Sequence, residues 1–302
     1  MAEAMHGTPR RFLAPEVLAR LQNLELAART AVEGALIGGH RSALLGFSQE
    51  FAEYRAYEPG DDLRFVDWNV YARADRLCVK RFFGDTNTQV LVLLDVSGSM
   101  GFGSGGLPKL DYARLIAAAL FYLGSRQHDA VGLLAFDARV RAFVAPSSRA
   151  PRVRGLYHEL DRLEAGSTTS VELPFAFLRE RLPRRSIVVL VSDFWMDPRP
   201  LRRTLQPLAR RGHDLLLVHL LDPAERSPDL AGTPRVRDLE TGGRLDVDVA
   251  DLKEEYPKRL ALHLAEIRRI AGELRAGYVP VNTHEPLDRT LFEYLRFRRR
   301  RA

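Results

Sequence analysis

From residue 89 onward, short apolar runs alternate with amphipathic stretches. The runs are continuously apolar and of core-strand length, which is typical of parallel strands buried on both faces of a sheet. The stretches between them carry apolar residues at helical spacing. We expect strands at 89–96, 130–136, 186–192, 214–221 and 277–281, and helices at 110–126, 149–163, 171–182, 201–212, 251–276 and 286–301.

This alternation predicts an α/β fold, a doubly wound and mostly parallel sheet with helices on both faces. Residues 139–146 follow the second strand after a short turn, so we expect them to add one antiparallel edge strand. Residues 235–249 look like a hairpin insertion around Thr241-Gly242-Gly243. The chain then divides into an N-terminal part (1–88), a sheet domain with the hairpin insertion (89–283), and a C-terminal helix with a basic tail (284–302).

The N-terminal part follows a different pattern. A helix is predicted at 13–37, and a charged, aromatic segment follows at 50–83. Within that segment, Asp61 or Asp62 could cap a short helix before a strand begins. We expect the segment to dock on the sheet domain, with Trp68 as an anchor in the interface.

Composition narrows the class of protein. With 302 residues and 46% hydrophobic content, the chain can bury a large core, which excludes an intrinsically disordered protein. Cys78 is the only cysteine, which excludes a disulfide scaffold. No apolar run approaches the ~20 residues that a membrane span needs, and the first residues lack the apolar region of a signal peptide. We therefore expect a cytoplasmic protein without a transmembrane segment.

The net charge of +6 gives a weak indication of an acidic partner. Much of it comes from arginines at the end of the chain, which could bind nucleic acid or anionic lipid. A solvated terminus is the commoner outcome for such a tail, so we do not expect nucleic acid as the partner. The arginines are Arg296, Arg298, Arg299, Arg300 and Arg301.

Residues with candidate functional side chains lie where the strand at 89–96 ends. Asp95, Ser97 and Ser99 alternate along the segment Leu-Asp-Val-Ser-Gly-Ser, and Gly98 lets the loop curl so that both hydroxyls can face one point. In open α/β sheets, ligands bind outside the carboxyl ends of the strands. One carboxylate and two hydroxyls form an all-oxygen surface that suits a hard cation such as Mg²⁺.

Two further elements belong to the same edge of the predicted sheet. Asp193 ends the strand at 186–192, as Asp95 ends its own, and Thr168 or Thr169 lies in a loop that opens a helix. Two carboxylates among hydroxyls leave an octahedral ion with waters and one position for an outside ligand. The ion would be Mg²⁺, with Mn²⁺ or Ca²⁺ as alternatives.

This set of residues resembles the metal-ion-dependent adhesion site of von Willebrand factor A (vWA) domains. The resemblance implies that Ser97, Ser99 and Thr168 bind the ion directly or through water, while Asp95 and Asp193 balance its charge and orient waters. It also implies that a carboxylate from a partner protein completes the coordination.

The chain as a whole, over roughly residues 40–295, resembles the domain-of-unknown-function 58 family. The resemblance implies a partner as well, an AAA+ ATPase of the MoxR type with which such vWA proteins work in chaperone-like assemblies. The matching residues include Glu50, Phe51, Tyr57, Pro59-Gly60-Asp61-Asp62, Arg64, Asp67-Trp68, Ala72-Arg73 and the segment Asp-Leu-Glu-Thr-Gly-Gly at 238–243.

We therefore expect a non-enzymatic, metal-dependent protein-binding protein of the adaptor or chaperone-like kind. One alternative is a metal-assisted phosphohydrolase that uses Asp95 as its nucleophile. A second acid is usual two residues later in such enzymes, and Ser97 stands there instead. The other alternative is a nucleic-acid binder that works through its arginines.

Overall fold

The computed structural model describes residues 50–59, 61, 66–83, 88–166, 168–182, 185–228, 235–237, 239–240, 242–246 and 249–300. The helix predicted at 13–37 lies outside these residues.

Six strands form the central sheet, in the order β10-β7-β6-β3-β4-β5. Every neighbouring pair is parallel except β4 and β5, so the predicted antiparallel edge strand is confirmed. The chain passes from β3 to β4 on one side and reaches β6 on the other, which makes the carboxyl end of β3 the topological switch point. The bounds are β3 Gln89–Asp95, β4 Ala130–Phe136, β5 Val140–Ser147, β6 Ser186–Ser192, β7 Asp214–Leu221 and β10 Gly277–Asn282.

Strand β3 shows why the central strands consist of continuous apolar runs. Its residues alternate between the two faces of the sheet, and each face has its own hydrophobic core. Val92 and Leu94 pack into one core, whereas Leu91 and Leu93 pack into the other. Both sets are fully buried, so no position of the strand is left for a solvent-facing polar residue.

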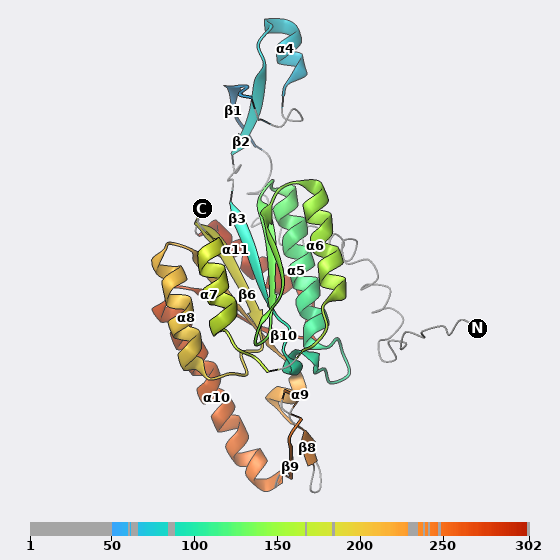
Figure 1. The fold of residues 1–302 in the computed structure, drawn as a ribbon, viewed down its shortest axis with the longest axis vertical. Coiled ribbons are helices and arrows are strands. Elements are labelled where there is room, and N and C mark those ends of the chain that lie inside the picture. The colour runs from blue at the N-terminus through green and yellow to red at the C-terminus, as the bar shows by residue number, and fades with distance from the viewer. Residues whose placement is uncertain are drawn as a thin grey trace, which may run out of the picture.

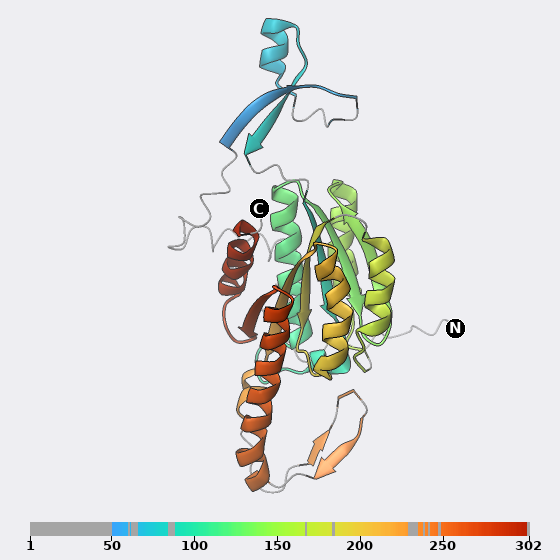
Figure 2. The ribbon, with the colours of Figure 1, turned by 90° about the vertical axis from the view of Figure 1, so that its left-hand side faces the viewer.

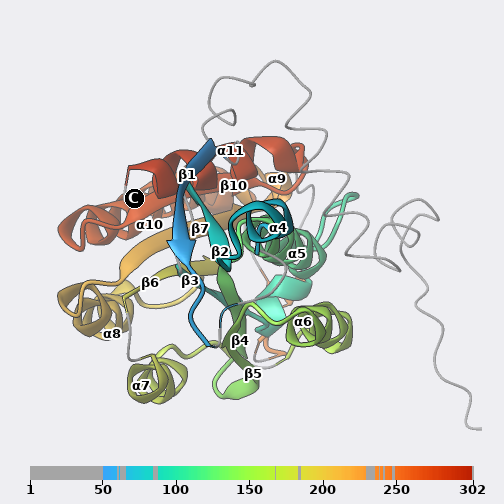
Figure 3. The ribbon, with the colours of Figure 1, turned by 90° about the horizontal axis from the view of Figure 1, so that it is seen from above.

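Helices cover both faces, as the sequence predicts, and Figure 3 shows the sheet between them. Helices α5 (Lys109–Arg126), α6 (Ala150–Arg162) and α11 (Leu287–Arg299) supply apolar residues to one core. Helices α7 (Glu172–Arg181), α8 (Pro198–Arg210) and α10 (Val249–Glu273) supply them to the other. Leu201, Leu205 and Leu208 of α8 show the helical spacing that buries one stripe and leaves the opposite side to arginines.

The N-terminal segment forms a unit of its own. Strands β1 (Glu50–Ala56) and β2 (Cys78–Phe83) pair antiparallel, and helix α4 (Trp68–Ala74) connects them. Figures 1 and 2 show this unit beyond the end of the sheet where β3 begins. Trp68 is 56% exposed and packs edge-on to Tyr71, so the expectation that Trp68 is an interface anchor is wrong.

The cap of helix α4 also differs from the prediction. Asp67 caps the helix, because its carboxylate accepts hydrogen bonds from the backbone N–H groups of Asn69 and Val70. Asp61 instead accepts a hydrogen bond at 2.7 Å from Arg55 and caps no helix. The pattern of three aspartates within seven residues was compatible with more than one cap.

The last helix is fastened to the sheet by a buried ion pair. Arg298 of α11 donates to both carboxylate oxygens of Asp129, which directly precedes β4. Only 7% of the Arg298 side chain is exposed, and none of Asp129. Arg298 therefore belongs to the core of the domain, and the expectation of a solvated basic tail is wrong for this residue. Arg296 and Arg300 are exposed.

The predicted hairpin insertion is present between β7 and α10. Strands β8 (Arg235–Arg237) and β9 (Arg244–Asp246) pair antiparallel and follow the short helix α9 (Pro223–Arg226). Figure 1 shows this hairpin below the edge of the sheet at which β3 ends, close to the 3₁₀ turn η3 (Gly98–Gly101).

Candidate functional site

Asp95 ends β3 and is held in one orientation from two directions. Its Oδ1 accepts a hydrogen bond from the backbone N–H of Ser97 at 2.9 Å, and its Oδ2 accepts one from the hydroxyl of Ser192 at 2.6 Å. Ser192 is the last residue of the neighbouring strand β6. The side chain of Asp95 is fully buried, so both of its oxygens are committed within the protein.

The two serines of the loop face each other across a short gap. The hydroxyl oxygens of Ser97 and Ser99 lie 3.1 Å apart. Mg²⁺ binds oxygen at about 2.0–2.1 Å in octahedral geometry, so two neighbouring ligands are about 3 Å apart. The spacing of the two hydroxyls therefore fits adjacent positions around one Mg²⁺ ion.

Asp193 follows β6 and takes part in an ion pair that the sequence does not predict. Its Oδ2 lies 2.6 Å from the ammonium nitrogen of Lys109, and the same ammonium lies 2.5 Å from Oε1 of Glu225. The side chain of Lys109 is fully buried. Trp195 adds a backbone N–H bond to Asp193 and an indole N–H bond to Glu225, both at 3.2 Å. Only one signal could have indicated this role of Lys109, which is that lysine is rare in the chain.

Burial and the neighbouring charges together explain the pKa directions of Asp95 and Lys109. Burial, and then the negative charge of Asp193, raises the pKa of Asp95 to about 7. Burial alone would lower the pKa of Lys109, but the charges of Asp193 and Glu225 outweigh it and raise that pKa above its ordinary value.

The loop after α6 brings a third chain segment to the site. The backbone N–H of Gly166 donates to the carbonyl oxygen of Val96 at 2.6 Å, which fixes the loop beside β3. Thr168 is exposed. Thr169 has a different role, because its hydroxyl donates to Oε1 of Glu240 at 2.8 Å and its backbone N–H to Oε2 at 3.2 Å. Among the described residues, no carboxylate makes such a contact with the hydroxyl of Thr168.

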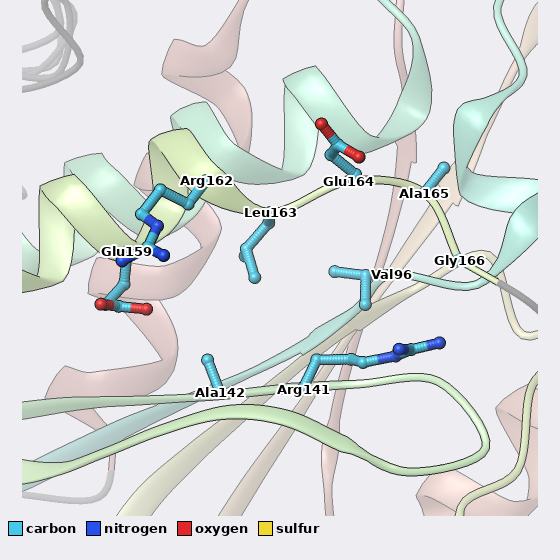
Figure 4. Close-up of a pocket in the computed structure, with 9 residues that line it drawn as sticks. All are labelled: Val96, Arg141, Ala142, Glu159, Arg162, Leu163, Glu164, Ala165 and Gly166. Carbon is cyan, nitrogen blue, oxygen red and sulfur yellow. The ribbon is translucent and has the colours of Figure 1, made fainter.

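A cavity of about 390 Å³ opens beside this loop. Figure 4 shows it between the end of α6 and strand β5. Val96 and Gly166 line it on the side of the loop that carries Ser97 and Ser99, which is called the metal-site loop below. Charges of both signs surround it, with Arg141 and Arg162 opposed by Glu159 and Glu164. A ligand reaching the end of β3 from this side would meet polar, charged walls.

The structure thus places the predicted site residues at one edge of the sheet. Asp95, Ser97 and Ser99 are joined by hydrogen bonds, Asp193 is adjacent to Ser192, and the loop of Thr168 is tied to Val96. In the part of the chain that the structure describes, no three His, Cys, Asp or Glu side chains are grouped to hold a metal. A divalent ion here would depend on hydroxyls, as the sequence predicts; metal binding itself stays a prediction.

The prediction missed Lys109, Glu225, Ser192 and Glu240. Ser192 could have been noted, because it directly precedes Asp193 at the end of the same apolar run. Lys109 and Glu225 are separated by 116 residues, and Thr169 and Glu240 by 71, so only the fold brings them together.

Comparison with known proteins identifies the relatives of the chain. The family described as "Protein of unknown function DUF58" matches residues 53–266. Uncharacterised proteins of Mycobacterium bovis and Mycobacterium tuberculosis are each 28% identical over 299 residues, which cover 95% of this chain and 92% of theirs.

A conserved hypothetical protein, BatB of Bacteroides thetaiotaomicron, superposes with a TM-score of 0.50 at 15% identity, covering 70% of this chain and 99% of that one. The VWA domain of SpRpn10 gives a TM-score of 0.41 at 10% identity, covering 68% and 93%. The strand order described above confirms the expected α/β fold, a mostly parallel sheet with one antiparallel edge strand and helices on both faces.

Among the described residues, no helix combines the length and the apolar character that crossing a bilayer requires.

Proposed function

This chain belongs to the DUF58 family, and we propose that it binds a partner protein through a divalent cation held at the carboxyl end of β3. The observation that carries the proposal is the 3.1 Å spacing of the Ser97 and Ser99 hydroxyls beside the fixed carboxylate of Asp95. When bound, the ion would supply a Lewis-acidic position for a carboxylate of the partner.

Each residue of the candidate site has a separate role in this proposal. Ser97, Ser99 and Thr168 hold the ion directly or through water. Asp95 supplies negative charge to the site and is held in one orientation by Ser192 and the backbone of Ser97. Asp193 does the same from β6, and Lys109 fixes its position. Mg²⁺ is the expected ion, with Mn²⁺ or Ca²⁺ as alternatives.

A binding function is favoured over hydrolysis by the surroundings of Asp95. A nucleophilic carboxylate needs an oxygen that can approach a substrate. Asp95 is fully buried, so neither of its oxygens is exposed to a substrate. We therefore propose a non-enzymatic, adaptor-like or chaperone-like protein rather than a phosphohydrolase.

We further propose a MoxR-type AAA+ ATPase as the partner and a cytoplasmic location, both on the basis of family resemblance. The charged cavity beside the site gives room for residues that flank the partner's carboxylate. A nucleic-acid partner is less well supported, because Arg298 is buried against Asp129 and cannot contact phosphates.

The test compares the full chain with a double variant, Ser97→Ala/Ser99→Ala. Titration calorimetry with Mn²⁺ should show binding to the wild type and at least about a tenfold loss in the double variant, since two direct ligands are removed. Ser125→Ala serves as the matched control, because Ser125 is exposed near the end of α5. Capture of a MoxR-type ATPase by the immobilised chain should require Mg²⁺ or Mn²⁺. Equal capture in excess chelator would show the metal mechanism to be wrong.

A phosphoester assay addresses the alternative function. Turnover of a generic phosphoester by the pure protein, lost in Asp95→Asn, would favour the hydrolase. We expect no turnover by either protein.

A further inference from the structure

The tip of the β8–β9 hairpin lies directly against the loop that carries the predicted metal ligands. The backbone carbonyl oxygen of Leu239 is so near Gly98 that a Cβ added to this glycine would lie 2.5 Å from it. Gly98 is the residue between the two metal-site serines. Its lack of a side chain therefore allows this loop and the hairpin to touch backbone to backbone.

The next residue of the hairpin brings a carboxylate to the same place. Glu240 accepts two hydrogen bonds from Thr169, one from the hydroxyl and one from the backbone N–H. Thr169 directly follows Thr168, the third proposed hydroxyl ligand. Glu240 is thus held between the loop of the serines and the loop of the threonine, and it is only partly buried.

The hairpin is also connected to the buried charges beneath the site. It is attached at one end to helix α9 and at the other to helix α10. Glu225 of α9 contacts Lys109, and the hydroxyl of Tyr256 in α10 donates to the backbone carbonyl of Glu225 at 2.5 Å. The helices that precede and follow the insertion in the chain are therefore joined to each other beside the site.

We propose that Glu240 is an internal carboxylate ligand that faces the open position of the metal site, so that a partner's carboxylate binds by replacing it. This inference rests on the proposed function, because it requires the ion. It adds that the unbound protein covers its own site and that release of the hairpin is part of partner binding.

Two variants separate the effect of the charge of Glu240 from the effect of its hydrogen bonds to Thr169. Glu240→Gln keeps a hydrogen-bond acceptor for Thr169 and removes the charge, while Glu240→Ala removes both. Glu172→Gln is the matched control, since Glu172 is an exposed carboxylate three residues after Thr169. Titration with Mn²⁺ should show about a tenfold weaker affinity in both Glu240 variants and an unchanged affinity in the control.

Hydrogen exchange gives a second measurement that does not depend on affinity. In the wild type, Mn²⁺ should slow exchange at the backbone N–H groups of Thr169 and of residues 239–243 at least several-fold, because the ion fixes the hairpin tip. In Glu240→Gln, Mn²⁺ should have no such effect on these residues. Peptides from α8 provide the internal reference in both proteins.

The outcomes distinguish the two proposals. If the wild type and Glu240→Gln bind Mn²⁺ equally and the ion leaves exchange of the hairpin unchanged, Glu240 is not a ligand and the proposed metal site still stands. If the wild type binds no Mn²⁺ at millimolar concentration, the proposed function fails and this inference with it.

Discussion

Lys109 and Asp193 form an ion pair that is buried on both sides, with 2.6 Å between the ammonium nitrogen and Oδ2. Lys109 is the first residue of helix α5 and Asp193 directly follows strand β6, so the pair joins the helix layer to the sheet at the candidate site. Glu225 shares the same ammonium, which gives one cation for two carboxylates.

Loss of Lys109 should be strongly destabilising. Lys109→Met leaves Asp193 and Glu225 buried without their cation, and removal of one partner of a buried ion pair costs about 3–5 kcal/mol. Lys258→Met is the matched control, because Lys258 also contacts two carboxylates, Glu254 and Glu255, but on the surface. Its loss should change the free energy of unfolding by less than about 1 kcal/mol. Urea denaturation at pH 7 measures both, and similar losses in the two variants would contradict the prediction.

Arg298 should behave differently from the other arginines of its helix. Arg298→Met leaves Asp129 buried and unpaired, which should lower the free energy of unfolding by about 3–5 kcal/mol. Arg296→Met, two residues earlier and 55% exposed, should change it by less than about 1 kcal/mol.

The double variant Arg298→Met/Asp129→Asn, which removes the buried charge of Asp129, should recover part of the stability lost in Arg298→Met. Thermal denaturation of the three variants and the wild type measures these differences, and an unaffected Arg298→Met protein would show that the pair is not structural.

A truncation that removes Arg298 would therefore not be a clean test of nucleic-acid binding. Substitution of the exposed Arg296 and Arg300 is the better test.

His213 should make the fold less stable in acid. Burial, and then the positive charge of Arg211, lowers the pKa of His213 below its ordinary value. The unfolded chain therefore binds a proton more readily, so this contribution to stability is fully present above about pH 6.5 and is lost as the pH falls toward the folded-state pKa.

Comparison with His213→Gln isolates this contribution. Between pH 7.5 and pH 5.5, the wild type should lose more free energy of unfolding than the variant does, by no more than about 1.4 kcal/mol per pH unit. Urea denaturation at each pH measures the difference, and identical pH profiles would contradict it.

Gly98→Ala should separate the hairpin from the metal-site loop. The new Cβ would lie 2.5 Å from the carbonyl oxygen of Leu239 and 3.2 Å from that of Gly166, so backbone must move. Hydrogen exchange within residues 239–243 should accelerate, while the core strands exchange as before. Gly155→Ala in helix α6 is the control, because a Cβ there meets nothing within 4 Å. Unchanged hairpin exchange in Gly98→Ala would show that the contact is not tight.

The central strands could be predicted because a strand that is buried on both faces of a sheet must consist mainly of apolar residues. Every residue of β6 and β7 is buried, which is why both strands consist mostly of apolar residues. The same logic located Asp95 and Asp193, since each is the first acidic residue after such a run.

The polar connections of the site could not be predicted in the same way. A lysine in the first turn of a helix is ordinarily solvated, and nothing near Lys109 in the sequence shows that Asp193 and Glu225 meet it. Glu240 stands in a turn whose composition predicts a hairpin but not where its tip will lie. The exposure of Trp68 could not be predicted either, because an aromatic residue in a short helix favours an interface without indicating which surface forms it.

The pair of Arg298 and Asp129 has a practical consequence for measuring these interactions. Asp129 precedes β4, so the pair holds the end of α11 at the edge of the sheet opposite to the one that carries Asp95. A fluorophore or surface tether attached after residue 300 would therefore leave the edge with Ser97, Ser99 and the hairpin facing solution, where an approaching partner can reach it.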